Sequence, residues 1–211
     1  MDFALQPALP EDAPRIAEIY FSAFTNTLSQ RLMPRTKEAE AFQTANFKKS
    51  AEEAQAGLGK DMIKILATAP DQQPVIAGFA LWKFYSGTSD SDDQGEKEKV
   101  EWPSSSDREL CESFFSGVER ERKTAIGDQP HYCLHMLAVD PAFGRRGLGA
   151  KLLKWGLDRA DEKRLTTFIS ASPAGRALYE KHGCRAVHNY EVVPGYRETS
   201  MVRPVAGLSR G

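Results

Sequence analysis

The feature that most constrains this chain is a strand, a glycine-rich loop and a helix that follow one another directly over residues 131–150. The apolar run HYCLHMLAV predicts a strand that ends at Val139. The loop GRRGLG follows, and from Ala150 the spacing is that of an amphipathic helix. The first N–H groups of a helix have no partner within it, and its dipole is positive there. Because Arg145 and Arg146 add positive charge, the pattern predicts a phosphate site, with a plain structural turn as the alternative.

The residues that we expect at this phosphate site are Gly144, Arg145, Arg146, Gly147, Leu148, Gly149 and Ala150. Two common phosphate-binding loops fit the sequence poorly. A Walker loop needs Ser or Thr after its lysine, whereas Lys151 is followed by Leu152. A dinucleotide-binding loop needs a small residue where Leu152 stands and follows the first strand of its unit, whereas this loop lies late in the chain. Both remain minor alternatives.

Three stretches, taken in their order and spacing, resemble the GNAT family of N-acetyltransferases. They are LAVDP at 137–141, RRGLGA at 145–150 and SPAGRALYEKHG at 172–183. The likeness is closest to the small-molecule or fungal-type small acetyltransferases and is firm over residues 129–193. The chain departs from the family at Gly144, where the family loop usually has Gln or Arg, so we expect a slightly looser hold on the phosphate.

The resemblance implies an α/β (α+β) fold in which helices cover both faces of a mixed, mostly antiparallel sheet that is splayed at the acetyl-CoA site. It also implies an N-acetyltransferase that moves an acetyl group from acetyl-CoA, its co-substrate, to a primary amine. A non-catalytic acyl-CoA-binding regulatory module of the same fold is the alternative, and a nucleotide phosphate-binding protein is a weaker third. The acceptor is a small molecule or a peptide. The sequence does not choose between them, because acceptor loops come from the regions of weakest resemblance.

The resemblance also places site residues beyond the loop. It puts the pantetheine arm along the strand backbone at Leu137, Ala138 and Val139, and adds Ser172 and Arg176 to the cofactor contacts. Tyr179 is then the acid that protonates the leaving thiolate, because the pKa of a phenol is close to that of a thiol. Spacing alone favours the alternative, a core tyrosine satisfied by one hydrogen bond.

The base that deprotonates the amine is less well defined. His135 lies in the central strand and titrates near neutrality, so it is a candidate, although a lone strand histidine is more often a packed or surface residue. A water chain, or deprotonation in solution, is the alternative. His131, Cys133 and His135 alternate and so share a strand face, which resembles a metal triad. Because a fourth ligand is missing and adjacent strand positions converge poorly, we predict no metal.

Composition sets the class of protein. A chain of 211 residues suits one domain over 1–211. A formal net charge of −1 gives no general attraction to nucleic acid or an acidic membrane. Three cysteines without a framework spacing favour unpaired thiols in a reducing compartment. The N-terminus has no signal-peptide pattern, so we expect a cytoplasmic, or else nuclear, protein that is a monomer or a homodimer.

Periodicity and turn residues predict the remaining elements. Asp12 is a candidate N-cap for a helix over 16–24, and the stripe Leu110, Phe114, Phe115 and Val118 is expected to be the buried face of another. The segment 86–106 is rich in Ser, Asp, Glu and Lys and predicts a flexible, solvated insertion, or alternatively an acidic flap that attracts a cationic amine. The other expected strands cover 3–9, 63–69, 75–85, 165–170, 186–193 and 199–204, and the other helices 38–56, 108–124 and 173–182.

Overall fold

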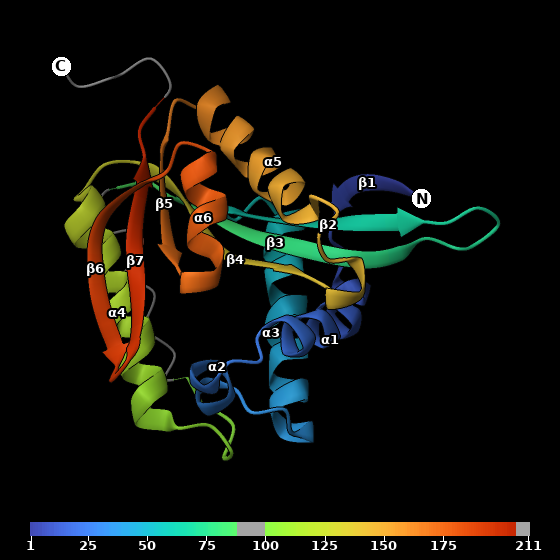
Figure 1. Cartoon of the computed structure of the whole chain (residues 1–211), viewed down its shortest axis with the longest axis horizontal. Coiled ribbons are helices and arrows are strands. Elements are labelled where there is room, and N and C mark those ends of the chain that lie inside the picture. The colour runs from blue at the N-terminus through green and yellow to red at the C-terminus, as the bar shows by residue number, and fades with distance from the viewer. Residues whose placement is uncertain (88–99, 206–211) are drawn as a thin grey trace. The chain divides into compact units, whose positions relative to one another are not determined.

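The computed structural model describes residues 1–87 and 100–205, and in this part of the chain seven strands form one sheet in the order β1-β2-β3-β4-β5-β7-β6 (Figure 1). The strands are β1 Asp2–Pro7, β2 Lys60–Thr68, β3 Val75–Tyr85, β4 His131–Val139, β5 Thr166–Ala171, β6 Arg185–Val193 and β7 Tyr196–Arg203. The helices are α1 Ala13–Ala23, α2 Thr27–Leu32, α3 Lys37–Gln55, α4 Arg108–Ile126, α5 Leu148–Glu162 and α6 Pro173–Lys181, and short 3₁₀ turns occupy Pro10–Asp12 and Pro141–Phe143. The predicted α/β class, with a mixed, mostly antiparallel sheet, is confirmed. The predicted strands and helices match these bounds within a few residues, except that α2 was not expected.

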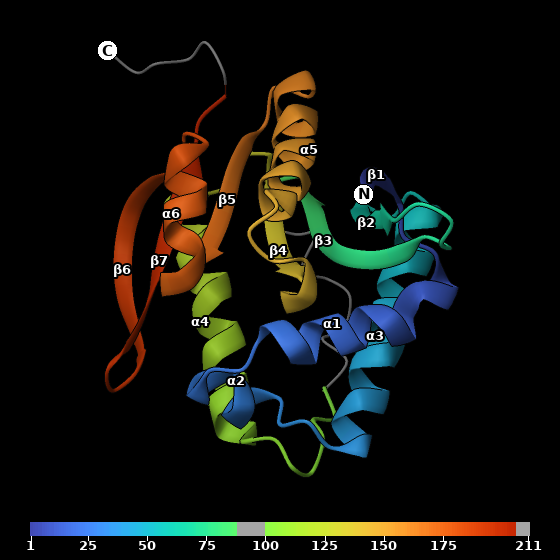
Figure 2. The same cartoon turned by 45° about the vertical axis from the view of Figure 1, so that its right-hand side comes forward.

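The chain forms two compact units. The first contains residues 1–82, 103–107 and 136–153. Its β1 and β2 pair antiparallel, and α1 packs against α3 (Figure 2). Ile16 and Ile19 of α1, Phe47 of α3 and Phe79 of β3 meet in one apolar core. The predicted helix over 16–24 therefore faces this core through Ile16 and Ile19. Thr36 caps α3 by accepting a hydrogen bond from the amide of residue 39 at 3.2 Å.

Asp12 occupies the predicted N-cap position of α1, but its side chain makes no capping hydrogen bond to the helix. Its carboxylate accepts a hydrogen bond from the backbone amide of Leu9 at 2.7 Å and lies 2.5 Å from the ammonium of Lys64. The reason is the 3₁₀ turn before α1, in which Asp12 already has helical dihedral angles, so its carboxylate turns back to Leu9, the N-cap of that turn.

The predicted insertion at 86–106 is described only in part, because residues 88–99 lie outside the described residues. Its last residues contact the start of α3 and the residue before it. Ser104 donates to Glu38 from its amide and its hydroxyl, at 2.9 and 2.6 Å, and the hydroxyls of Ser105 and Thr36 lie 3.0 Å apart. Any solvated insertion therefore ends before these residues.

The second unit contains most of the C-terminal half of the chain. Its β4 pairs in parallel with β5 over four residues, His131–Leu134 with 166–169. β7 pairs antiparallel with both β5 and β6. Helix α4 contacts one face of these strands through Glu121, which bonds to Ser200. Helix α6 contacts the other face, since Arg176 reaches Asn189 of β6. Asn189 pairs with the residue before Ser200, so its side chain points to the opposite side of the sheet from that of Ser200.

The predicted buried stripe of α4 is wrong at Phe115, which is 48% exposed and stacks on Trp102 with ring centroids 5.2 Å apart. The helix instead buries the polar residues Glu121 and Arg122. These side chains are buried because they have hydrogen-bond partners on the strands, which the apolar periodicity does not reveal. No helix among the described residues combines the length and the hydropathy that a bilayer span requires.

Candidate active site

The predicted phosphate loop is an exposed turn that leads into α5. Gly147 has a φ of 75° and Arg145 a φ of 56°, both in the left-handed region. Leu148 is buried and anchors the start of the helix in the core. The first helical hydrogen bond runs from the amide of Lys151 to the carbonyl of Gly147 at 3.1 Å. Within the described part of the chain, the amides of residues 145–150 have no acceptor, so they are available to an anion.

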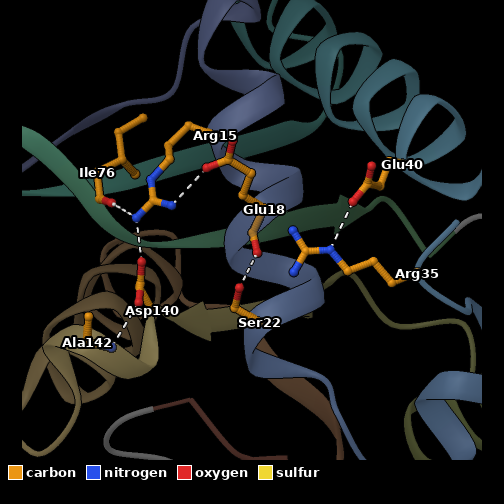
Figure 3. A network of polar contacts seen from close by, with 8 residues as sticks. All are labelled: Arg15, Glu18, Ser22, Arg35, Glu40, Ile76, Asp140 and Ala142. Atoms are coloured by element: carbon orange, nitrogen blue, oxygen red, sulfur yellow. Dashed lines mark hydrogen bonds and ion pairs between the residues drawn. The ribbon is translucent and has the colours of Figure 1, made fainter. Parts of the chain in front are cut away.

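Asp140 holds the beginning of this loop in place (Figure 3). Its amide donates to the carbonyl of Ala77 at 2.9 Å, and its Oδ1 accepts from the amide of Ala142 at 2.9 Å. Its Oδ2 forms an ion pair with Arg15 of α1, which also donates to the carbonyl of Ile76 at 3.3 Å. One carboxylate thus ties the end of β4 to α1 and to β3. No sequence pattern points to Arg15, which lies 125 residues from Asp140.

Gly78 of β3 allows a close approach between β3 and the end of β4. A Cβ built at Gly78 would lie 2.8 Å from the carbonyl oxygen of Ala138 and 3.2 Å from the Cα of Val139. It would also lie 3.3 Å from the side chain of Leu152 in α5. Only glycine fits here. A glycine inside a predicted strand is itself a sequence signal for such a close approach, and the sequence analysis did not use it.

The second group of predicted residues lies on and before α6. Ser172 is the N-cap, and its hydroxyl accepts from the amide of Gly175 at 3.3 Å. Arg176 donates to Glu180 at 2.7 Å and to Asn189 at 3.4 Å, so its guanidinium is held on the surface of the helix. Both residues have structural partners, and their contact with a cofactor stays a prediction.

Tyr179 is a buried phenol, 9% exposed, whose ring lies against the backbone of Gly175. A Cβ at Gly175 would come within 2.9 Å of the ring. Burial first, and then the charges of Cys184 and Glu198, raises the pKa of Tyr179 to about 12. Its hydroxyl has no hydrogen-bond partner among residues 1–87 and 100–205. The phenol therefore keeps its proton and is free to donate it.

The raised pKa of this phenol does not prevent transfer to a departing thiolate. Burial also raises the pKa of the thiols of this unit, to about 11 for Cys184 and about 12 for Cys133. A thiolate that leaves in an equally dry place has a similarly raised pKa. The two groups are then matched well enough for a proton to pass between them.

His135 lies at an exposed position of β4, with Nε2 3.0 Å from the hydroxyl of Tyr85. The Tyr85 ring stacks on His131 at 4.9 Å and lies under the guanidinium of Arg122 at 3.8 Å. His131 is buried, with Nε2 2.7 Å from Arg122 and Nδ1 2.7 Å from the carbonyl of Gln129. Because Arg122 can only donate, His131 is the neutral tautomer with its proton on Nδ1.

These contacts separate the three residues that alternate in the sequence. His131 contacts Arg122, His135 contacts Tyr85, and Cys133 is buried as a thiol in an apolar cluster with Phe168. Each side chain therefore has its own structural role, and the alternation follows from the strand.

Glu198 is a candidate functional residue that the sequence reasoning missed. It is 6% exposed on β7, and its Oε2 accepts hydrogen bonds from the hydroxyls of Ser170 at 2.5 Å and Tyr190 at 3.3 Å. Burial raises the pKa of Glu198, and the two hydrogen bonds partly oppose this. The only sequence signal is a carboxylate in a strand between Tyr196 and Ser200, which becomes informative once the strand register is known.

The predicted residues therefore fall into two sets. Residues 137–139 and 144–150 belong to the first unit, together with Arg15 and Asp140. The second unit holds Ser172, Arg176, Tyr179 and His135, together with Glu198.

A sequence model of the acetyltransferase (GNAT) family matches residues 82–184 of this chain. The matched range contains the glycine loop and α6 with Tyr179. A search of curated protein sequences finds no match.

Several solved acetyltransferase structures share the fold. The polyamine N-acetyltransferase of Drosophila melanogaster, which forms N-acetylagmatine, aligns with a TM-score of 0.68 and 12% identity over 97% of this chain and 100% of that chain. The structure of the histone acetyltransferase HPA2 and related acetyltransferase from Corynebacterium glutamicum aligns with a TM-score of 0.62 and 21% identity over the whole of both chains. The PaiA N-acetyltransferase of Thermoplasma acidophilum, solved with coenzyme A, aligns with a TM-score of 0.60 and 12% identity over 97% of this chain and 99% of that chain. Residues 82–184 therefore resemble an acetyltransferase domain of the GNAT family, and the chain has the fold of these acetyltransferase structures.

Proposed function

We propose that the protein transfers the acetyl group of acetyl-CoA to a primary amine. The observation that supports this most strongly is the row of unbonded amides at 145–150, inside the stretch that matches the GNAT model. Such a row at a helix N-terminus, beside two exposed arginines, fits the pyrophosphate of coenzyme A. The neighbour solved with coenzyme A and the neighbour that forms N-acetylagmatine have this fold, which agrees with the proposal.

The residues of the chain fit the cofactor in chemical type. The amides of 145–150, with Arg145 and Arg146, would hold the pyrophosphate. The backbone of Leu137 and Val139 lies beyond the four-residue ladder of β4 with β5, so it could pair with the amides of pantetheine as an added strand does. Ser172 and Arg176 are proposed as further contacts. When bound, the cofactor supplies the acetyl thioester.

The proposed chemistry removes two protons from the ammonium nitrogen, one before attack and one after, and supplies one proton to the sulfur. The amine must lose a proton so that its lone pair can form the new C–N bond to the acetyl carbon. As the C–S bond breaks, Tyr179 gives its phenolic proton to the leaving sulfur. His135 is exposed on β4 and is a candidate for the base that accepts the amine proton.

The test is thiol release from acetyl-CoA with benzylamine, putrescine and a peptide that has a free N-terminus and a lysine, beside calorimetry with acetyl-CoA. We expect micromolar to millimolar binding and turnover with at least one amine. Binding without turnover would favour the non-catalytic regulatory module. Displacement of coenzyme A by ATP or NAD at equal concentration would favour a nucleotide-binding protein instead.

A further inference from the structure

One face of the second unit carries a buried polar network. The strand register pairs Ser170 with Ser200 and Tyr190 with Glu198, so these side chains point to the same side of the sheet. Ser170 lies 2.7 Å from the hydroxyl of Tyr190, and both donate to Glu198 Oε2. Two hydroxyls from two other strands thus fix one carboxylate oxygen.

The second oxygen of this carboxylate is different. Glu198 Oε1 has no hydrogen-bond partner in the described part of the chain, and it is not among the fully enclosed unpaired atoms. An oxygen without a protein partner that is not enclosed stays accessible to water or to a bound group, so its lone pairs can be satisfied from outside the protein. The arrangement is that of a group oriented through one oxygen and open through the other.

Helix α4 packs against this face of the strands. Glu121 of α4 lies 2.7 Å from Nδ1 of His188 and 3.2 Å from the hydroxyl of Ser200, so it marks the level of Ser200 on the helix. α4 runs beside β7 in the same direction (Figures 1 and 2). Four helical residues rise about 6 Å and two strand residues about 6.7 Å, so Gly117 lies level with Glu198.

Gly117 is buried and belongs to the same helix stripe as Glu121. A Cβ built on it would meet no atom nearer than 3.8 Å, the end of Arg120. A glycine in the middle of a 19-residue helix costs about 1 kcal/mol relative to alanine. At this position of the stripe the helix therefore presents no side chain.

We propose that Glu198 is the catalytic base, which accepts the proton of the acceptor amine through Oε1 in the space that Gly117 leaves open. The proposal rests on the acetyltransferase function proposed above. One proton moves from the ammonium nitrogen to Glu198, and the freed lone pair forms the C–N bond to the acetyl carbon. As the C–S bond breaks, the sulfur takes the phenolic proton of Tyr179, and the new amide nitrogen gives its surplus proton to the phenolate. Glu198 then releases its proton to water, so both side chains return to their starting states.

The electrostatics of the site agree with this role. A raised carboxyl pKa brings Glu198 closer to neutrality, where a general base works best. The titratable groups that face it are Glu121 from α4, His188 and Tyr190 from β6, and Tyr196 from β7, and its charge also reaches Tyr179 of α6. The active form is the carboxylate, so activity should fall as the pH drops through the pKa of Glu198. His135 lacks this enclosure, because it is exposed and its Nε2 already bonds to Tyr85.

The test compares Glu198→Gln with Glu121→Gln, since Glu121 is equally buried on the same face and also bonds to a serine. Acetylation is measured with the best amine of the panel and with O-benzylhydroxylamine, whose nitrogen is unprotonated at neutral pH. With the amine, we expect kcat/KM of Glu198→Gln to fall by about 10²-fold or more at pH 7. With O-benzylhydroxylamine the loss should stay below about tenfold, because no proton has to be removed before attack. Glu121→Gln should lose less than about tenfold with both, and acetyl-CoA affinity should hold in each variant.

A second variant tests the space without touching the carboxylate. Gly117→Leu improves helix propensity, so folding should hold, and its side chain should fill the space and raise the KM of the amine by about tenfold without changing acetyl-CoA affinity. Equal losses of Glu198→Gln with both nucleophiles, or an unchanged Gly117→Leu, would overturn the assignment while the wild type stays active. A wild type that binds acetyl-CoA and acetylates nothing would instead overturn the proposed function.

Discussion

The glycine loop of the first unit and the Glu198 network of the second unit are built on opposite principles. The loop is exposed, and backbone geometry shapes it: two left-handed residues, a row of amides without acceptors and one clamp through Asp140. The network is buried, and side chains from three strands shape it, with pKa values that burial has shifted. Backbone donors hold a permanently charged group at any pH, whereas a buried titratable group can move a proton. The contrast teaches that binding and chemistry should respond to different mutations.

The strongest test of this contrast is Gly147→Asp in the loop. Asp is strained at a φ of 75° and puts a negative charge where the pyrophosphate would lie. We expect acetyl-CoA affinity to fall by about 100-fold or more, as measured by calorimetry. Gly57→Asp is the matched control, because Gly57 also has a positive φ, of 69°, and open space around it. If both variants bind acetyl-CoA like the wild type, the loop is not the phosphate site.

Tyr179→Phe should change the rate of the chemical step without changing acetyl-CoA binding. The ring keeps its packing, and the lost hydroxyl has no hydrogen-bond partner among the described residues, so stability should change by less than about 1 kcal/mol. The turnover number should fall by about 10²-fold, while acetyl-CoA affinity holds. Equal turnover, with the chemical step shown to be rate-limiting, would make Tyr179 a packing residue.

The pH profile gives Tyr179 a second readout. Because burial raises its pKa to about 12, the phenol stays protonated above pH 10, where a free tyrosine is half ionised. Turnover of the wild type should therefore not decline between pH 9 and 10.5 through this group. A decline in that window that Tyr179→Phe removes would contradict the burial argument.

Arg15→Ala tests whether the clamp matters for binding. It removes the ion pair with Asp140 and the hydrogen bond to Ile76. The loop should then sample more conformations, and acetyl-CoA affinity should fall by about tenfold, or about 1.4 kcal/mol. Arg35→Ala is the control, because Arg35 pairs with Glu40 on the surface of the same unit (Figure 3). Its loss should change the free energy of acetyl-CoA binding by less than about 0.5 kcal/mol. Similar losses in both variants would remove the special role of the clamp.

The same contrast explains what could be predicted from the sequence. The loop, its helix and α6 follow from local signals, since glycine, proline and N-cap residues act within a few positions of themselves. Glu198 could not be predicted, because its partners Ser170 and Tyr190 are 28 and 8 residues away and meet it only through the register of three strands. Phe115 was misplaced for the related reason that polar residues occupy the buried face of α4. Sites formed by residues close together in the sequence can be predicted from it, whereas sites formed by side chains from different strands cannot.

The smallest expected effect concerns the long-range charge of the loop. Arg145→Asn with Arg146→Gln removes two charges, and Asn tolerates the left-handed φ of residue 145, so the backbone donors stay in place. We expect a loss of acetyl-CoA affinity of about fivefold at low ionic strength. It should shrink as salt rises, because the screening length falls from about 10 Å at 0.1 M to about 3 Å at 1 M.

The matched control lies just beyond the other end of the same helix. Lys163→Gln with Arg164→Asn removes the same charge, and Arg164 also has a positive φ, of 53°. Since the helix dipole is negative at that end and no row of unpaired amides faces solvent there, acetyl-CoA affinity should stay within about twofold of the wild type. Equal, salt-dependent losses in both double variants would mean that only net charge attracts the cofactor. A loss confined to 145 and 146 that persists at 1 M salt would mean that the guanidinium groups bind the phosphates directly, as the amides do.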